Sequence, residues 1–552
     1  MKIPSTREKD RFMTTYDAVV IGAGHNGLVS ASYLANNGYS VLVLESRSVP
    51  GGATGDFEFL PGYRGAFTNS PGSFDPLVLR ELELERYGLR FFRPELAVVH
   101  RFEDQTFIGW RDKTKLAAEI DQFRRGESDR YATLIADLDY LGKSLPVSLY
   151  HVPDPLEVIE RKLETDRARA LFKKVFHGSL RELMDEYLET PQMKAVLMML
   201  ALNGNRISPE EPGSAVGLLL RPLSMSAHTQ LDAAFQASPL RGSAGLPVGG
   251  MNSIVRALVN LISAHPGSAV RTDSPVTGVQ RNSRTGALDV VLADGTTVAT
   301  RRVLSAIDPR QTVCEIFGSF EELESARNDF ADKEIHGSAF KIALALDALP
   351  EYAGLPEGVT SADASTCQFR VAHSDQAISA ALAEALTDQP STNPIMWGLN
   401  LSVASPGYHS PTGKYLLSVN AWHAPYSLAD GTWNRETVDA FGRRCLDDIR
   451  GLLPDIDSKI VDTRFMGPVE IEATLGLPKS NITYGDMSVA GLFEGRPLPS
   501  LQGARTPVAG LYLCGSGVWP GGYVTGIPGR NAAQALMADS PPGGVAERGS
   551  LT

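Results

Sequence analysis

A short apolar run that ends in a glycine-rich turn is the feature that most constrains how this chain can fold. Residues 18–21 are Ala-Val-Val-Ile, and they are followed by Gly22-Ala23-Gly24-His25-Asn26-Gly27 and by an apolar helical pattern from Leu28 to Ala35. This order predicts a strand, a tight turn and a helix. In such a unit the first glycine permits the turn, the second lets the backbone approach a pyrophosphate, and the third lets the helix pack on the strand. We therefore expect a phosphate at the helix N-terminus, where unpaired N–H groups point at an anion.

A second apolar run and an acidic residue complete the predicted dinucleotide half-site. The helix is expected to stop at Asn37-Gly38, the run Val41 to Leu44 follows, and Glu45 stands at its end. A carboxylate at this place accepts hydrogen bonds from ribose hydroxyls, and its charge disfavours the 2′-phosphate of NADP. The alternative is a glycine turn that binds no ligand. The strand, the helix and the acid together argue against that alternative.

The segment after Glu45 favours FAD over NAD as the dinucleotide. Five residues separate Glu45 from the paired glycines Gly51 and Gly52. This spacing resembles the extended FAD signature shared by amine oxidases, phytoene desaturases and their relatives. The resemblance implies that the paired glycines bring a loop against the pyrophosphate and that Arg47 helps to bind the cofactor. An exposed surface charge is the alternative for Arg47.

The middle of the chain carries further signals for the same domain. They are a glycine pair, an apolar helix and three strand-like runs, at residues 249–250, 254–262, 270–279, 288–292 and 302–309. Asp294-Gly295 is a tight-turn signal, so we expect a hairpin there. This region resembles the middle of phytoene-desaturase-like proteins, which implies that the backbone of Val276 meets the adenine. The alternative is that Val276 is simply a strand residue.

The last informative stretch lies near the C-terminus. An apolar strand pattern, Gly510 to Cys514, leads into a glycine-rich turn that continues through Gly529 and then into a helical pattern through Met537. Such a turn is a backbone surface that can lie flush against a planar ring, and the helix N-terminus offsets negative charge on a reduced flavin. We therefore expect this stretch to close the site that the N-terminal turn opens.

This C-terminal stretch resembles the closing motif of bacterial phytoene desaturases, desaturase-like carotenoid ketolases and pyridine nucleotide-disulfide oxidoreductase domain-containing proteins. Asn481-Ile482, Met487-Ser488 and Arg496-Pro497 fit the last subgroup best. The likeness covers most of the chain in order. With the turn residues above, it gives the expected cofactor-binding set: Gly22, Ala23, Gly24, Asn26, Gly27, Glu45, Ser46, Arg47, Gly51, Gly52, Ala53, Val276, Gly515, Ser516, Val524, Thr525 and Gly526.

The pattern does not assign the catalytic residues. Relatives commonly carry histidine where this chain has Trp519, and the amine oxidases carry an acidic residue where it has Ser516. The loss of histidine argues against a mechanism that needs a titratable group at the position of Trp519. Trp519, Tyr523 and His423 are weak candidates, with core packing as the alternative for each.

These segments predict an α/β fold, with a Rossmann-type FAD-binding domain of the glutathione-reductase-like, amine oxidase and phytoene desaturase type, interleaved with an α+β substrate domain. At 552 residues the chain exceeds the roughly 250–300 residues at which a single core stops growing. We assign the FAD-binding domain to residues 14–105, 241–310 and 471–540, and the substrate domain to residues 106–240 and 311–470. Residues 1–13 and 541–552 are expected to be flexible termini.

The intervening segments hold most of the long helical patterns. Two apolar stretches, 196–200 and 216–220, can line a pocket for an apolar molecule, and ordinary core helix is the alternative. Strand-like runs at 340–346, 396–401 and 416–422 are expected to form a sheet whose face covers the flavin, with four aromatic or imidazole side chains near the strand ends: Trp397, Trp422, His423 and Tyr426.

Composition excludes several classes of function. The net charge of −12 argues against a nucleic-acid partner. The four cysteines are far apart, so they form neither a redox pair nor a metal spacing, and each is expected to be a small buried side chain. The polar start and the lack of an 18-residue apolar run make a cytoplasmic protein the default. The basic segment 167–174 is interpreted as a solvated helix face, with contact to a membrane surface as the alternative.

The leading function is an FAD-dependent dehydrogenase or desaturase that takes a hydride from a largely apolar, polyene-like or carotenoid-like substrate. Oxygen or a quinone is the expected diffusible acceptor, because no second dinucleotide fingerprint occurs. Amine or other C–N oxidation, ketolation and isomerisation are alternatives within the same fold. An escort protein of the GDP-dissociation-inhibitor type is the non-catalytic alternative, and the complete glycine and acid set argues against it.

Overall fold

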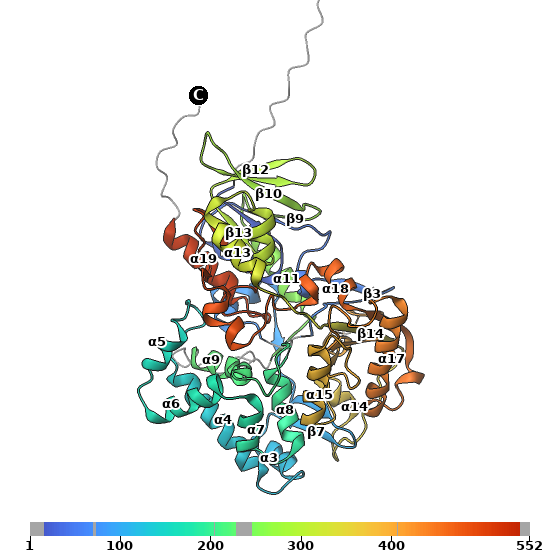
Figure 1. Ribbon diagram of the computed structural model, residues 1–552. Helices are drawn as coiled ribbons and strands as arrows, with labels where there is room; N and C mark the ends of the chain where they lie inside the picture. Colours follow the sequence, from blue (N-terminus) through green and yellow to red (C-terminus); the bar gives the residue numbers. More distant parts are fainter. Residues whose placement is uncertain (1–15, 70–72, 204, 228–244, 406, 541–552) are drawn as a thin grey trace, which may run out of the picture.

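The computed structural model describes residues 16–69, 73–203, 205–227, 245–405 and 407–540 (Figure 1). The predicted termini, 1–13 and 541–552, lie outside the described residues. Figure 1 shows three regions: a sheet-and-helix region at the top, a helical region at the lower left, and a second sheet at the lower right.

The upper region is built on a parallel sheet of five strands in the order β21-β13-β1-β2-β9. The strands come from the N-terminal, middle and C-terminal parts of the chain: β1 Ala18–Ile21, β2 Val41–Leu44, β9 Ala269–Arg271, β13 Val303–Ser305 and β21 Leu511–Leu513. Since every neighbouring pair is parallel, the carboxyl ends of all five strands meet at one edge. The segments predicted to share one domain therefore do share one sheet.

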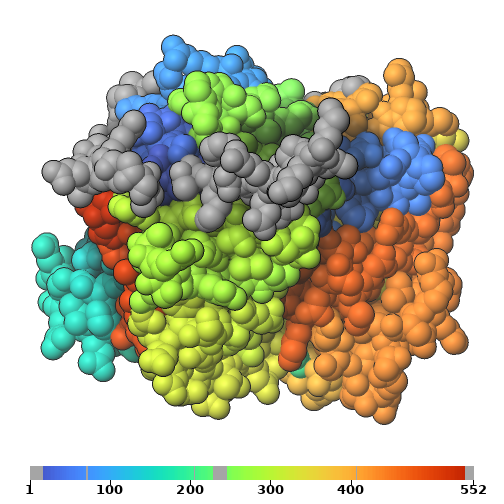
Figure 2. Space-filling model, turned by 90° about the horizontal axis from the view of Figure 1, so that it is seen from above, coloured from blue at the N-terminus to red at the C-terminus, as the bar shows by residue number. Residues whose placement is uncertain are grey.

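Helices cover one face of this sheet and a small antiparallel sheet covers the other. Three helices pack together on the first face: α1 His25–Asn36, α11 Asn252–Ser263 and α19 Ile527–Asp539. The other face contacts β10 Val276–Arg281, β11 Leu288–Leu292 and β12 Thr297–Thr300. The predicted hairpin at Asp294-Gly295 joins β11 to β12. In the view from above (Figure 2), the light green to yellow segments that carry β10–β12 and α13 Glu324–Asp332 form much of the surface.

Strand alternation explains why both faces of the parallel sheet are buried. Val20 and Val43 point into the helical side, whereas Val19 and Leu42 point into the side of the small sheet. A parallel sheet with two covered faces needs apolar residues at nearly every strand position. This is why the runs at 18–21 and 41–44 are continuously apolar instead of alternating.

The second sheet has seven strands in the order β18-β14-β17-β16-β15-β6-β7. Their bounds are β6 Leu96–Arg101, β7 Thr106–Trp110, β14 Phe340–Leu346, β15 Gln368–Val371, β16 Met396–Asn400, β17 Tyr415–Ala421 and β18 Ile460–Met466. The three strand-like runs predicted at 340–346, 396–401 and 416–422 are thus neighbours or near neighbours. Helix α17 Arg435–Leu452 covers one face, and the opposite face turns toward the helical region and the candidate site.

The helical region is assembled from residues 113–227. Its longer helices are α3 Lys113–Asp121, α4 Glu127–Ser144, α7 Leu180–Tyr187, α8 Pro191–Ala201 and α9 Leu220–Ala227. The basic segment lies on α6 Asp166–Phe172 and the turn after it. Ion pairs join three of its cations, Arg167, Arg169 and Lys174, to carboxylates. Such pairs are typical of a solvated helix face, and contact of this segment with a membrane surface stays a prediction.

The structure places several features differently from the sequence predictions. Strand β6 lies in the predicted FAD segment but pairs with β15 in the seven-stranded sheet. Residues 311–332, predicted as substrate domain, pack instead on the parallel sheet through Phe317 and Phe320. Tertiary packing decides both cases, and short apolar patterns do not encode it.

Cys314 is exposed, unlike the other three cysteines. Among the described residues, no helix is both long and apolar enough to cross a membrane.

Candidate cofactor and substrate site

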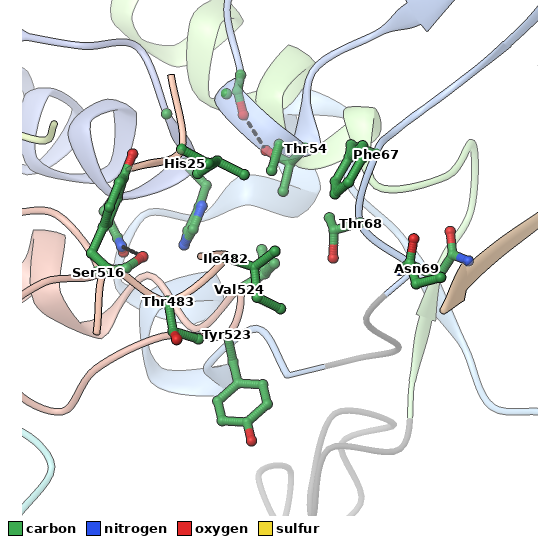
Figure 3. Close-up of a pocket in the computed structure, with 18 of the residues that line it drawn as sticks. His25, Thr54, Phe67, Thr68, Asn69, Ile482, Thr483, Ser516, Tyr523 and Val524 are labelled. Atoms are coloured by element: carbon green, nitrogen blue, oxygen red, sulfur yellow. Dashed lines mark hydrogen bonds between the residues drawn. The ribbon is translucent and has the colours of Figure 1, made fainter. Parts of the chain in front are cut away.

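A cavity lies where the carboxyl edge of the parallel sheet meets the seven-stranded sheet. Its lining includes Gly24 and Gly52 from the N-terminal part and Ser516 and Val524 from the C-terminal part. Figure 3 shows His25, Thr54, Phe67, Thr68 and Asn69 around this opening, together with Ile482, Thr483, Ser516, Tyr523 and Val524 from the C-terminal part of the chain. The two ends of the chain therefore share one cavity, as the glycine patterns predicted.

The glycines of the first turn divide into structural and open positions. Gly22 has φ +92°, a left-handed conformation that glycine adopts without strain. A Cβ on Gly27 would lie 2.2 Å from the Gly22 carbonyl oxygen, so this glycine permits the close packing of helix on strand. A Cβ on Gly24 would meet no described atom within 4 Å, and this partly exposed residue lines the cavity. The open space at Gly24, at the N-terminus of α1, fits a pyrophosphate.

Glu45 joins the first turn to the loop that follows β2. Its Oε2 accepts a hydrogen bond of 2.9 Å from the Ala23 N–H, and its Oε1 accepts one of 3.0 Å from the Arg47 N–H. The Ser46 hydroxyl donates to the same Oε1 at 3.3 Å. Glu45 is buried, so its carboxylate is fixed at the end of the strand. The predicted hydrogen bonds to ribose hydroxyls would add to this arrangement.

Arg47 and the paired glycines hold a loop against the first turn. The Arg47 guanidinium donates to the Gly52 carbonyl at 3.1 Å and lies 3.6 Å from Glu45 Oε1. The Gly51 N–H donates to the Ala23 carbonyl at 2.8 Å. Gly51 has φ +122°, which only glycine adopts readily. Arg47 is thus half-buried and positions the loop, and the alternative of a solvated surface charge does not describe it.

Val276 begins strand β10 next to the acidic end of the half-site. The Ser274 N–H donates to the Glu45 carbonyl at 2.8 Å, and the Asp273 N–H donates to the Arg47 carbonyl at 3.0 Å. Val276 itself is partly buried and packs on the face of the parallel sheet that carries the small sheet. It does not line the cavity of Figure 3, but its strand lies beside the residue expected to bind the ribose. Its contact with adenine stays a prediction.

Direct contacts join the C-terminal stretch to the first turn. The Asn26 side-chain amide donates to the Ser516 hydroxyl at 3.2 Å, and the Ser30 hydroxyl donates to the Gly529 carbonyl at 2.8 Å. A Cβ on Gly515 would lie 2.6 Å from the Ala306 carbonyl oxygen, so only glycine fits between β21 and the turn after β13. Gly526 caps α19 with φ +76°.

Eight of the expected cofactor-binding residues line the cavity: Gly24, Asn26, Gly27, Gly51, Gly52, Ala53, Ser516 and Val524. The others lie behind it or beside it. Thr525 lines an adjoining cavity, while the remaining residues support the lining through the backbone contacts described above. A local sequence pattern identifies both the residues that line the cavity and those that support the lining, because the same glycines encode the turn geometry and the ligand contact.

Two of the three catalytic candidates do not lie at the site. The Trp519 indole N–H donates to the Ser148 carbonyl at 2.9 Å, and its ring packs 5.2 Å from the ring of Phe493. Neither Trp519 nor His423 lines the described cavities. Burial lowers the pKa of His423 to about 3, so this imidazole is a neutral core group. Core packing, the alternative for both residues, explains their positions.

Tyr523 is the catalytic candidate that the structure retains at the site. It lines the cavity of Figure 3 and also the adjoining larger one. Its backbone has φ +66°, an uncommon conformation for a tyrosine. Burial raises the pKa of its phenol to about 12, which keeps the hydroxyl protonated at neutral pH. Tyr523 can therefore act as a wall or a hydrogen-bond donor between the two cavities.

Sequence reasoning missed a buried lysine beneath the cavity. Lys341 is fully buried on β14, and its Nζ donates to the Phe67 carbonyl at 2.7 Å, the Asn420 Oδ1 at 2.9 Å and the Asn69 Oδ1 at 3.3 Å. Burial holds the pKa of Lys341 well below its usual range. Its three acceptors belong to residues that line the cavity. The one sequence signal is a charged residue inside the otherwise apolar run 340–346.

His25 and Arg496 were also missed as site residues. His25 lines the cavity, and burial lowers the pKa of its imidazole to about 4. Arg496 is buried beneath the C-terminal turn, where Nε donates to the Ser516 carbonyl at 3.2 Å and Nη1 donates to the Gly491 carbonyl at 3.1 Å. Burial lowers the pKa of this guanidinium to about 10. The Arg496-Pro497 motif is thus a support that positions Ser516.

A second cavity, of about 800 Å³, adjoins the first. Four residues line both cavities: Asn203, Gln368, Trp397 and Tyr523. The walls of the second cavity are largely apolar and come from the helical region; they include Leu116, Ile120, Ile135, Leu138, Leu197, Leu200 and Leu218. The stretches 196–200 and 216–220 thus contribute to a pocket wall, as one of their two interpretations proposed.

Comparisons with known proteins identify the family. Residues 20–76 match the model of the NAD(P)-binding Rossmann-like domain. Residues 209–537 match the model described as flavin containing amine oxidoreductase. The chain belongs to the flavin-containing amine oxidoreductase family. It is therefore an FAD-dependent oxidoreductase, and the residues around the first cavity fit that cofactor.

Two relatives and a solved structure show how widely this family resemblance extends. The mouse pyridine nucleotide-disulfide oxidoreductase domain-containing protein 2 is 30% identical over 96% of this chain and 94% of its own length. A limonene dehydrogenase subunit of Castellaniella defragrans is 23% identical over 95% of this chain and 94% of its own. Cyclohexylamine oxidase from Brevibacterium oxydans shares the fold, with a TM-score of 0.56, 14% identity and coverage of 95% and 99%. The resemblance predicted from the motifs is confirmed, and the escort-protein alternative is set aside.

Proposed function

We propose that this flavin-containing amine oxidoreductase is a dehydrogenase or desaturase for a largely apolar substrate, with polyene and carotenoid-like molecules among the candidates. The observation that carries the proposal is the second cavity, whose apolar walls lead through Trp397 and Tyr523 to the cofactor site. The leucine and isoleucine side chains of the helical region give this cavity a mainly apolar surface, which is typical of sites for apolar ligands, and charged side chains line the rest of it. The relative named as a limonene dehydrogenase subunit supports an apolar substrate.

Bound FAD supplies an acceptor for the hydride that a dehydrogenase removes from carbon. The residues of this chain bind and orient the two reactants. Gly24 and the loop at Gly51-Gly52 would hold the pyrophosphate, and Ser516 and Val524 from the C-terminal part line the same cavity. Trp397 and Tyr523 stand at the opening between the cavities, where they can align a flat or extended substrate and exclude water.

Charge at the two cavities argues against an amine substrate. Among the described residues, no aspartate or glutamate lines the first cavity. The second is lined by two acids, Asp75 and Asp139, and five cations, Arg93, Arg111, Lys113, Arg221 and Arg370. Asp139 pairs with Arg221 at 3.4 Å, and Asp75 caps helix α2 Pro76–Glu81. A protonated amine would meet an excess of like charge. Amine oxidation is the alternative that the solved relatives suggest, and this charge pattern disfavours it.

Anaerobic reduction of the bound flavin tests the proposal. The holoprotein is mixed without oxygen with limonene, a polyene, cyclohexylamine and putrescine, and the flavin absorbance is recorded. We expect bleaching with an apolar compound and none with the amines. Bleaching with the amines alone would replace the proposal with C–N oxidation. A rearranged product without any bleaching would indicate isomerisation, and an oxygenated product would indicate ketolation.

Oxygen or a quinone is the proposed electron acceptor, and contact with a membrane surface is the proposed route for an apolar substrate. Stopped-flow reoxidation of the reduced holoprotein by oxygen and by a soluble quinone separates the two acceptors. Flotation with vesicles that contain anionic lipid tests the membrane contact, and a protein that stays at the bottom of the gradient ends that proposal.

A further inference from the structure

We infer that the substrate carries an acidic head group, a carboxylate or a phosphate, and that Arg370 binds this group in the second cavity. This inference rests on the proposed function, because it specifies the class of apolar substrate. The substrate would then be an amphipathic molecule with an apolar chain toward the cofactor and an anion at the other end.

A continuous row of side chains crosses the seven-stranded sheet from the first cavity to Arg370. The strand register pairs Lys341 with Asn420, Asn420 with Trp397, and Trp397 with Arg370. Asn420 lines the first cavity, Trp397 lines both cavities, and Arg370 lines the second. The sheet therefore presents one face along which a single ligand can extend from the cofactor site to a cation.

The alternation of β15 places Arg370 on the cavity face. Gln368 and Arg370 line the second cavity, while Phe369 and Val371 point into the core on the other face of the sheet. Gln368 also lines the first cavity. Arg370 lies two strands from Asn420, a separation of roughly 10 Å at the ~4.8 Å spacing of neighbouring strands. This separation sets the scale for the distance between the reacting end and the head group.

Arg370 is a buried cation without an anionic partner in the described part of the chain. Only 8% of the residue is exposed, and its Nε has no hydrogen-bond partner. The guanidinium lies over the Trp397 ring at 4.0 Å. Tyr131 and Cys367 are the groups whose negative charge would favour the charged form of Arg370, but burial raises the pKa values of both, so both are neutral at neutral pH. An unpaired buried charge is costly, and such charges are normally paired or bind a ligand.

Two further arginines surround the same place. Arg111, Arg221 and Arg370 line both the second cavity and a third one of about 260 Å³, so the three arginines border the region that these cavities share. Arg221 pairs with Asp139 at the edge of this region. Burial, and then the charge of Arg93, lowers the pKa of Arg111 to about 10. The potential at this junction is therefore positive, and guanidinium groups suit both carboxylate and phosphate oxygens.

Removing the Arg370 charge has a consequence that separates binding from folding. If the cation exists to bind a ligand, its loss weakens anion binding but leaves the unliganded protein at least as stable, because a buried unpaired charge is removed. If instead the guanidinium were a structural support, its loss would lower the thermal stability of the unliganded protein. The stacking on Trp397 is the contact that a structural role would use.

The experiment measures binding of dodecanoate, dodecyl phosphate and dodecanol to the FAD-loaded protein by calorimetry. The variants are Arg370→Gln, Arg370→Lys and, as a matched control, Arg443→Gln on the exposed side of α17. We expect at least one anion to bind more tightly than dodecanol to the wild type. We expect Arg370→Gln to weaken that anion roughly ten- to 100-fold, the range of a charge-assisted hydrogen bond, while dodecanol and the Arg443→Gln control stay unchanged. Arg370→Lys should restore part of the preference, and the melting temperature of unliganded Arg370→Gln should not fall.

The two anions distinguish the sources of the head group. A preference for dodecanoate assigns a carboxylate, and a preference for dodecyl phosphate assigns a phosphate. Equal affinity of the wild type for the anions and dodecanol would overturn the inference, and so would equal weakening of all three ligands in Arg370→Gln. In either case, bleaching of the flavin by a neutral apolar compound would leave the proposed function standing. Failure of all three probes to bind, together with no bleaching by any apolar compound, would remove the proposed function as well.

Discussion

Replacing Gly24 with alanine should separate cofactor binding from folding. A Cβ at this position would meet no described atom within 4 Å, and the backbone has φ −63° and ψ 164°, which alanine adopts freely. Gly24 is the N-cap of α1, where alanine is less favourable than glycine, but alanine also restricts the unfolded chain. Because each effect is about 1 kcal/mol or less and the two oppose each other, the stability of the apoprotein should scarcely change.

The effect on FAD should be much larger. The new methyl group would project into the space that the pyrophosphate is expected to fill. Overpacking of a fitted site costs about 1–3 kcal/mol, and each 1.4 kcal/mol is a factor of ten in affinity, so the Kd for FAD should rise roughly five- to 150-fold. Titration of apoprotein with FAD, followed by flavin fluorescence, measures this change. The melting temperature of the apoprotein is recorded in parallel.

Gly27→Ala is the matched control, because the same methyl group there meets protein instead of open space. Its Cβ would lie 2.2 Å from the Gly22 carbonyl oxygen and 2.9 Å from the Ala306 Cβ, so the apoprotein should lose stability. Unchanged FAD affinity in Gly24→Ala would refute the assignment of the pyrophosphate to this place. Equal destabilisation of the two apoproteins would show that Gly24, like Gly27, serves the fold.

Three other predictions follow from the buried groups. Burial lowers the pKa values of His25, His100 and His423 to about 4, 3 and 3. In the unfolded chain a histidine has a pKa of about 6.5, so below that pH the unfolded state binds more protons than the folded state. The folded protein should therefore keep its full stability above pH 6.5 and lose stability as the pH falls toward 4. A melting temperature that stays constant from pH 6.5 to pH 4 would contradict this. Lys341→Met should lower the melting temperature, because each buried acceptor left unpaired costs about 1–3 kcal/mol; an unchanged melting temperature would show that the three acceptors find other donors. Trp519→His should leave the flavin spectrum and its rate of reduction unchanged, and a change in either would make the residue a catalytic candidate again.

The parts of the fold that the sequence predicted are those encoded by local geometry. The strand, glycine turn and helix at 18–35 occur as predicted, with β1 and α1 on either side of the turn. Positive φ at Gly22 and close packing at Gly27 are backbone requirements that only glycine meets. A pattern of glycines therefore reports the backbone directly, and a site built from backbone can be found from sequence.

The parts that the sequence did not predict depend on contacts between distant segments. The strand patterns around Lys341 and Arg370 do not show which residues lie beside these two cations, and their placement follows from the register of the seven-stranded sheet. The placement of β6 in that sheet, instead of the FAD-binding domain, has the same cause. Trp519 was considered for catalysis because relatives commonly carry histidine at its position next to the glycine-rich turn, yet its side chain points to Ser148. Neighbours in sequence need not share a cavity.

The central claim is that the two ends of the chain bind one FAD molecule between them. A crystal structure of the holoprotein tests it most directly. We predict density for one FAD whose phosphates contact the backbone at Gly24 and whose ring system contacts the C-terminal turn near Val524. Density in which the ring system lies away from the C-terminal turn, or in which the phosphates do not touch Gly24, would contradict the claim.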